Sequence, residues 1–177
     1  MRAVIVYESI YGNTHKVAAR VAAGLDPRVD VQVVPISDAT EELVGRADVV
    51  IVGGPTHAHG LTSTSSRKGA RESADKPGSG LDLDPDAAGP GLRDWLGTLA
   101  AVQGTLAGAF DTRLDAAAVL TGRASHGIAR RLRSHGFTIV AEPESFLVGK
   151  DNRLLPGEAD RATAWGAHLA DVLTTVS

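Results

Sequence analysis

The chain contains no cysteine among its 177 residues. It therefore has no disulfide, no thiolate nucleophile and no cysteine-ligated zinc or iron–sulfur centre. Charge of one sign is also scarce, because 18 Lys and Arg stand against 21 Asp and Glu, for a formal net charge of -3. A balance this close to neutral argues against nucleic-acid binding and gives little electrostatic steering toward a charged partner.

Long apolar runs are missing as well. No stretch approaches the ~20 apolar residues of a membrane-spanning helix. The N-terminus also has no basic segment leading into a long apolar run with a small-residue cleavage site. We therefore expect no signal peptide, no membrane insertion and a cytoplasmic location. The length and the 43% hydrophobic content suit a single domain over 1–177, which would bury roughly 70% of the surface of its unfolded chain.

Short β-branched strands alternate with amphipathic helices in the first third of the chain. The spacing of apolar residues predicts helices at 14–25 and 40–46 and strands at 3–7, 29–35 and 48–53. We expect Gly53-Gly54-Pro55 to end the third strand. Such alternation implies right-handed crossovers between parallel strands, with helices covering the sheet, and so predicts an α/β fold.

The later part of the chain continues this pattern less regularly. Helices are predicted at 92–99, 125–135 and 158–176, with Ser125 as the N-cap and Gly136 as the stop of the middle one. A strand is predicted at 105–111, and residues 137–148 are extended but interrupted by Pro143. Residues 116–120 also have the composition of a strand.

Residues 61–90 interrupt the alternation. They are rich in Ser, Thr, Gly, Pro and Asp and contain no aromatic residue. We expect a long flexible loop, with a short helix allowed at 66–74 and none at 77–90. A loop of this length in a compact domain is functional or mobile, and a lid and a tolerated surface insertion remain alternatives.

The clearest local signal is Ser9-Ile10-Tyr11-Gly12-Asn13-Thr14, between the first strand and the first helix. The N–H groups and dipole of a helix N-terminus suit a phosphate, the two hydroxyls add donors, and glycine lets the backbone turn. The same turn would also serve as a capped connection with no ligand. Neither Gly-x-x-x-x-Gly-Lys-Ser/Thr nor Gly-x-Gly-x-x-Gly occurs here, which argues against triphosphate and dinucleotide sites.

Two segments resemble the flavodoxins. Ser9 to Thr14 is similar to their phosphate loop, Thr/Ser-x-Thr-Gly-x-Thr, at the first position, the glycine and the last threonine. Gly53-Gly54-Pro55-Thr56-His57 resembles the Gly-x-Pro-Thr-Tyr turn that touches the isoalloxazine ring, and Phe110 to Arg113 falls where the third flavin-contacting loop should begin. The resemblance implies a flavodoxin-like three-layer sandwich with five parallel strands in the order 2-1-3-4-5.

The cofactor that the resemblance implies is flavin mononucleotide (FMN), bound in the crevice between strands 1 and 3, where the strand order reverses. On loops at the ring position, His57 could stack on the flavin, and no metal is expected at the His57–His59 pair. No catalytic acid–base triad is expected, because the flavin carries the chemistry. The residues assigned to FMN are Ser9, Ile10, Tyr11, Gly12, Asn13, Thr14, Pro55, Thr56, His57, Ala58, Gly60, Asp111, Thr112 and Arg113.

Three functions remain open at this point. The first is a redox protein that carries electrons between a redox partner protein and its acceptor through the bound FMN. The second is an NAD(P)H-dependent quinone-type reductase with a small electron acceptor, which the mild acidity and the lack of aromatic residues at 111–127 favour slightly over a carrier. The third is a non-catalytic flavodoxin-like module that binds a partner through the 61–90 segment.

Overall fold

A computed structural model of the chain describes residues 1–25, 28–57 and 60–176. Its centre is a parallel sheet in the order β2-β1-β3-β5-β6, in which β7 also pairs with β5. The strands are β1 (Arg2–Tyr7), β2 (Asp30–Pro35), β3 (Val49–His57), β5 (Leu106–Leu114), β6 (Thr138–Ile139) and β7 (Glu144–Val148). The predicted order 2-1-3-4-5 is therefore confirmed, with β6 and β7, on either side of Pro143, together forming the predicted fifth strand.

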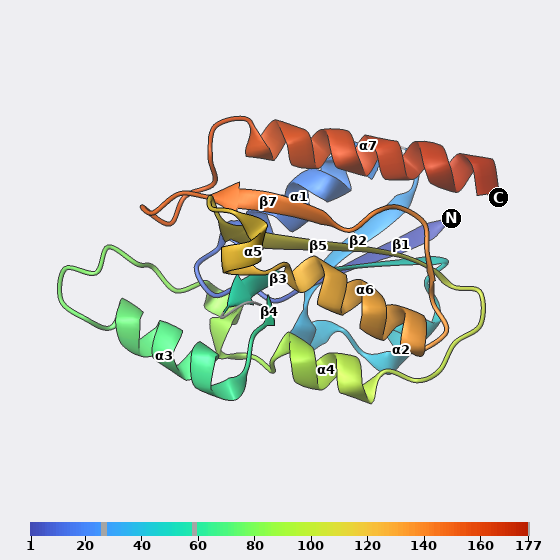
Figure 1. Ribbon diagram of the computed structural model, residues 1–177. Coiled ribbons are helices and arrows are strands. Elements are labelled where there is room, and N and C mark those ends of the chain that lie inside the picture. The colour runs from blue at the N-terminus through green and yellow to red at the C-terminus, as the bar shows by residue number, and fades with distance from the viewer. Residues whose placement is uncertain (26–27, 58–59, 177) are drawn as a thin grey trace.

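Helices cover both faces of the sheet, as Figure 1 shows. On one face lie α1 (Asn13–Leu25) and α7 (Glu158–Val176); on the other lie α2 (Glu41–Gly45), α4 (Leu92–Thr98) and α6 (Ala124–Ser134). The central strands are apolar at nearly every position because both of their faces are buried. Each face has its own core, with Ile5, Ile51 and Trp165 on one and Val4, Val52 and Ile128 on the other.

The close contact between α1 and α7 depends on two glycines. A Cβ atom at Gly24 would lie 2.1 Å from the Thr163 carbonyl oxygen, and one at Gly166 would lie 2.2 Å from the Val21 carbonyl oxygen. Because no side chain fits at these distances, the two backbones pack directly on each other. This contact fixes the C-terminal half of α1 against α7.

Four local predictions are wrong. Residues 116–120 do not form a strand: α5 (Ala118–Thr121) is a short helix, and Val119 and Leu120 are 85% and 67% exposed. Ser125 does not cap α6, whose N-cap position is Arg123. β3 does not end at Gly53 but continues to His57 and pairs antiparallel with β4 (Gly60–Leu61). The 77–90 stretch contains one short helical turn, η2 (Pro85–Ala88).

The 61–90 segment contains more regular structure than its composition indicates. It holds α3 (Thr64–Ala74), which begins with a capping box made by Ser63 and Ser66, followed by η2. The flexibility of the 61–90 segment stays a prediction.

A second 3-10 turn, η1 (Ile36–Asp38), follows β2. None of the helices in the described ranges is long and apolar enough to cross a bilayer.

Candidate functional site

A pocket of about 300 Å³ lies where the carboxyl ends of β1, β3 and β5 meet. This is the edge at which ligands bind in open α/β sheets. The predicted site residues that line it are Ile10, Tyr11, Asn13, Thr14, Pro55, Thr56, His57, Thr112 and Arg113, and they are joined by Leu114, Val148 and Asn152. Ser9, Gly12, Gly60 and Asp111 do not line it, and Ala58 lies outside the described residues.

The turn before α1 has the geometry of an anion site. The Ser9 hydroxyl accepts a hydrogen bond from the Gly12 N–H at 3.1 Å, and Gly12 has a φ of 84°, which favours glycine. In the described part of the chain, the N–H groups of Asn13, Thr14 and His15 donate to no protein acceptor. These are the free donors of a helix N-terminus, and they suit a phosphate.

Two buried threonines join this turn to β5. The hydroxyl oxygens of Thr14 and Thr112 lie 2.8 Å apart, and both side chains are nearly inaccessible apart from the pocket that they line. One of the two hydroxyl hydrogens is used between them. The other remains available to donate to a ligand in the pocket.

Asn152 is a pocket residue that the sequence analysis missed. The Asn13 amide donates to the carbonyl oxygen of Asn152 at 3.0 Å and to its side-chain oxygen at 3.2 Å. Asn152 has a φ of 58°, held by a turn in which its N–H donates to the Gly149 carbonyl. The polar stretch after β7 signals a turn, but its contact with a residue 139 positions away has no local signal.

Two of the predicted flavin-contacting residues also cap the N-terminus of α6. Thr56 Oγ1 accepts from the Ala124 N–H at 2.9 Å, and Asp111 Oδ2 accepts from the Ser125 N–H at 2.7 Å. Asp111 is completely buried, and this burial raises the pKa of its carboxyl despite the Ser125 N–H. Thr56 also lines the pocket, whereas Asp111 lies behind it. Both residues therefore hold the loops around the pocket in place.

The basic side chains that line the pocket are those of His57 and Arg113. Burial lowers the pKa of His57, and the nearby Glu8 charge opposes this shift only in part. The ring is therefore neutral at neutral pH. The Arg113 guanidinium donates to the Ala116 carbonyl at 2.7 Å and to the Thr121 hydroxyl at 3.3 Å, so it holds the loop that contains α5 at the mouth of the pocket.

The 61–90 segment supports the phosphate-type turn from its other side. The Tyr11 hydroxyl donates to the Ala70 carbonyl at 2.8 Å, and the Asp84 N–H donates to the Ile10 carbonyl at 2.7 Å. Arg67 of α3 lies 2.9 Å from the buried Glu8 carboxylate at the end of β1. The segment thus supports the turn from behind, although none of its residues lines the pocket.

Comparisons with known proteins agree with this architecture. Residues 4–67 match a family model described as a flavodoxin domain. Among solved structures, a flavodoxin from the domain Archaea has 21% identity and a TM-score of 0.65, with 97% of each chain covered. Flavodoxin 1 from Bacillus cereus has 18% identity and a TM-score of 0.65, covering 97% of this chain and 98% of its own.

A WrbA-like flavodoxin from Agrobacterium tumefaciens has 22% identity and a TM-score of 0.60, with 98% of each chain covered. No curated protein matches the sequence significantly. At these identities, the structural comparisons establish the fold alone.

Proposed function

We propose that this flavodoxin-like protein binds FMN in the pocket at the ends of β1, β3 and β5, and that it carries electrons through the bound flavin. The observation that carries the proposal is the turn from Ser9 to Thr14, whose free N–H groups open into this pocket beside the Thr14 and Thr112 hydroxyls. When bound, the flavin supplies the redox chemistry, and the protein positions it and tunes its potential.

The donors and the size of the pocket fit a mononucleotide. The turn offers one phosphate site, which Ser9 to Thr14 would form, while Pro55 to His57 and Thr112 would flank the ring. A volume of about 300 Å³ lies at the lower end of the range for small-molecule sites. The sequence also lacks the glycines of a dinucleotide turn. FMN therefore fits better than FAD or NAD.

A second candidate function is an NAD(P)H-dependent quinone-type reductase. The observation that favours it is the apolar surface at the pocket mouth, where Leu114 lines the pocket and is 55% exposed, and where Val119 and Leu120 project from α5. Such a rim, on a chain with a net charge of only -3, suits a small apolar electron acceptor better than a basic redox protein.

Cofactor analysis of the untagged protein tests the first proposal. We expect a yellow protein that releases FMN on denaturation, identified by its mass, and a cofactor-free form that quenches FMN fluorescence on titration. As a control, Lys16→Gln removes an exposed charge outside the pocket, and this variant should bind FMN as tightly as the parent does. A protein that binds FAD or NAD and no FMN would contradict the proposal.

Steady-state assays of the FMN-loaded protein separate the two functions. A reductase should oxidise NADH or NADPH with a water-soluble quinone as acceptor, and Leu114→Glu should slow this turnover by placing a charge at the apolar rim. Leu83→Glu is the control, because Leu83 is an exposed leucine that does not line the pocket. Absence of turnover with either nicotinamide would favour the carrier.

A further inference from the structure

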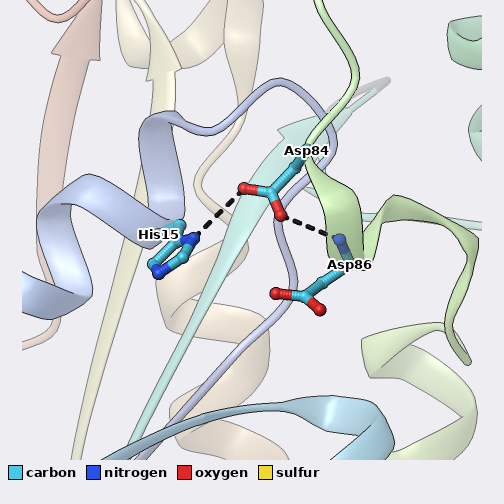
Figure 2. Close-up of side chains that lie close together, drawn as sticks. All are labelled: His15, Asp84 and Asp86. Carbon is cyan, nitrogen blue, oxygen red and sulfur yellow. Dashed lines mark hydrogen bonds and ion pairs between the residues drawn. The ribbon is translucent and has the colours of Figure 1, made fainter.

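Three metal-binding side chains from distant parts of the sequence meet beside the phosphate-type turn. His15 lies in the first turn of α1, and Asp84 and Asp86 lie at the start of η2 (Figure 2). One potential ligand atom from each residue lies within 4.8 Å of the other two, and His15 Nδ1 is 3.4 Å from Asp84 Oδ2. The three ligand atoms are thus close enough together to bind one ion.

The cluster lacks positive charge. The Asp84 side chain is only 2% exposed, and Asp86 is half-buried. Across the described ranges, neither carboxylate has a Lys or Arg within ion-pair distance, and the basic group that faces Asp84 is the His15 imidazole. Burying a carboxylate without a positive partner is costly, and two neighbouring carboxylates repel each other. A bound cation would remove both costs.

Each of the three side chains is also held by a second contact. Asp84 Oδ1 accepts from the Asp86 N–H at 3.0 Å, which leaves Oδ2 facing His15. Asp86 Oδ2 accepts from the Tyr7 hydroxyl at 2.8 Å. The His15 ring stacks on the Tyr7 ring, with centroids 4.5 Å apart and planes 19° apart. Partners of this kind orient the ligands of metal sites.

We propose that His15, Asp84 and Asp86 bind a divalent first-row transition ion, of which Zn²⁺ and Mn²⁺ are examples. One imidazole nitrogen with two carboxylate oxygens is a donor set that these ions accept, whereas Mg²⁺ and Ca²⁺ prefer oxygen ligands only. The exposed side of His15 leaves the remaining coordination positions to water. The site does not rest on the flavin, because none of its three ligands lines the FMN pocket.

The bound ion would add a further link between two elements that already touch at the phosphate-type turn. Asp84 and Asp86 belong to the 61–90 segment, and His15 belongs to the helix that carries the phosphate-type turn. A Cβ atom at Gly12 would lie 3.8 Å from Asp84 Oδ2, so the ion would lie next to that turn. Because only the folded chain brings these ligands together, binding should raise the melting temperature.

Isothermal titration of the untagged full chain with ZnCl₂, and loss of the free Mn²⁺ EPR signal on mixing, test this proposal. We expect one ion per chain, and His15→Gln and Asp86→Asn should each weaken binding by about tenfold or more. His126→Gln is the matched control, because it removes an exposed histidine of α6 and should leave the affinity unchanged.

Circular dichroism checks that each variant folds. If His15→Gln fails to fold, the binding measurement on Asp86→Asn decides the outcome. Three results would overturn the proposal: no saturable binding of Zn²⁺ or Mn²⁺ at millimolar concentration, equal affinity in the parent and the ligand variants, or binding of Mg²⁺ as tight as that of Zn²⁺. A melting temperature that Zn²⁺ raises in the parent and in His126→Gln, but in neither ligand variant, would support it.

Discussion

Replacing Arg67 by methionine would remove the positive charge that faces the buried Glu8 carboxylate. The Glu8 residue is 5% exposed and the Arg67 side chain 12%. Arg67 Nε lies 2.9 Å from Glu8 Oε1, but its N–H is not aimed at that oxygen, so the contact is mainly electrostatic. Glu8 Oε2 accepts from the Thr62 hydroxyl at 2.6 Å and from the Leu92 N–H at 2.9 Å, and these two bonds would survive the change.

The expected loss of unfolding free energy follows from these contacts. Removing one partner of a buried ion pair typically costs 3–5 kcal/mol, because it leaves a buried charge without a counter-charge. Because two hydrogen bonds to Glu8 survive and the Nε–H is not aimed at the carboxylate, we expect Arg67→Met to cost about 3 kcal/mol of unfolding free energy, at the lower end of this range. For a chain of this size, that loss lowers the melting temperature by about 6–12 °C.

Urea unfolding of Arg67→Met, Glu8→Gln and the double variant measures the loss and its origin. Because Glu8→Gln removes the stranded charge, the double variant should be less destabilised than the sum of the singles, by about 1 kcal/mol or more. Arg71→Met is the control on the same helix, since Arg71 donates to the Ala87 carbonyl and, among the described residues, pairs with no carboxylate. A cost under about 1 kcal/mol for Arg67→Met, or strict additivity, would refute the reasoning.

Three further predictions concern the pocket and the Asp111 carboxyl behind it. Thr14→Val should weaken FMN binding by about tenfold or more, because it removes a hydroxyl worth roughly 1.5–3 kcal/mol beside a charged group; fluorescence titration checks this, and unchanged affinity would mean that the hydroxyl serves only Thr112. In His57→Phe, the flavin midpoint potential should rise less steeply with falling pH than in the parent, below about pH 6.5. The reason is that burial lowers the His57 pKa, and only the protonated ring favours reduced flavin. Identical slopes of potential against pH in the two proteins, at one ionic strength, would contradict this. The raised pKa of Asp111 means that its contribution to stability is present below its unfolded pKa of about 3.9 and is lost as the pH rises through the folded value. The stability of the parent relative to Asp111→Asn should therefore fall with rising pH in urea unfolding, and a flat or rising difference would exclude this role.

Much of the fold could be predicted because its signals are local. The buried run Val49–Val52 and the helical spacing of α7 identify their elements without knowledge of the partner. Residues 116–120 were misassigned because periodicity cannot distinguish a short apolar run that forms a strand from one that forms a helical turn. The α6 cap was misassigned because Thr56 and Asp111 cap that helix from other strand ends, and no rule based on neighbouring residues detects such partners.

The candidate site divides in the same way. The turn from Ser9 to Thr14 is encoded within six residues, so its place before α1 could be read from the sequence. The contact of Asn13 with Asn152, and that of His15 with Asp84, join residues far apart along the chain. They arise only when the sheet order is set, so a single sequence contains no sign of them.

The attachment of the 61–90 segment has a consequence for protein engineering. Its composition makes it a natural target for deletion in a minimal scaffold, since surface loops tolerate changes in length well. Deleting it would remove the ion pair of Arg67 with Glu8. It would also remove the hydrogen bond from the Asp84 N–H to the Ile10 carbonyl and the one from the Tyr11 hydroxyl to the Ala70 carbonyl. Shortening is therefore compatible with the rest of the chain between residues 76 and 80. No side chain is buried there, and the hydrogen bonds found among the described residues are local, between Ser79 and residues 74, 76 and 81.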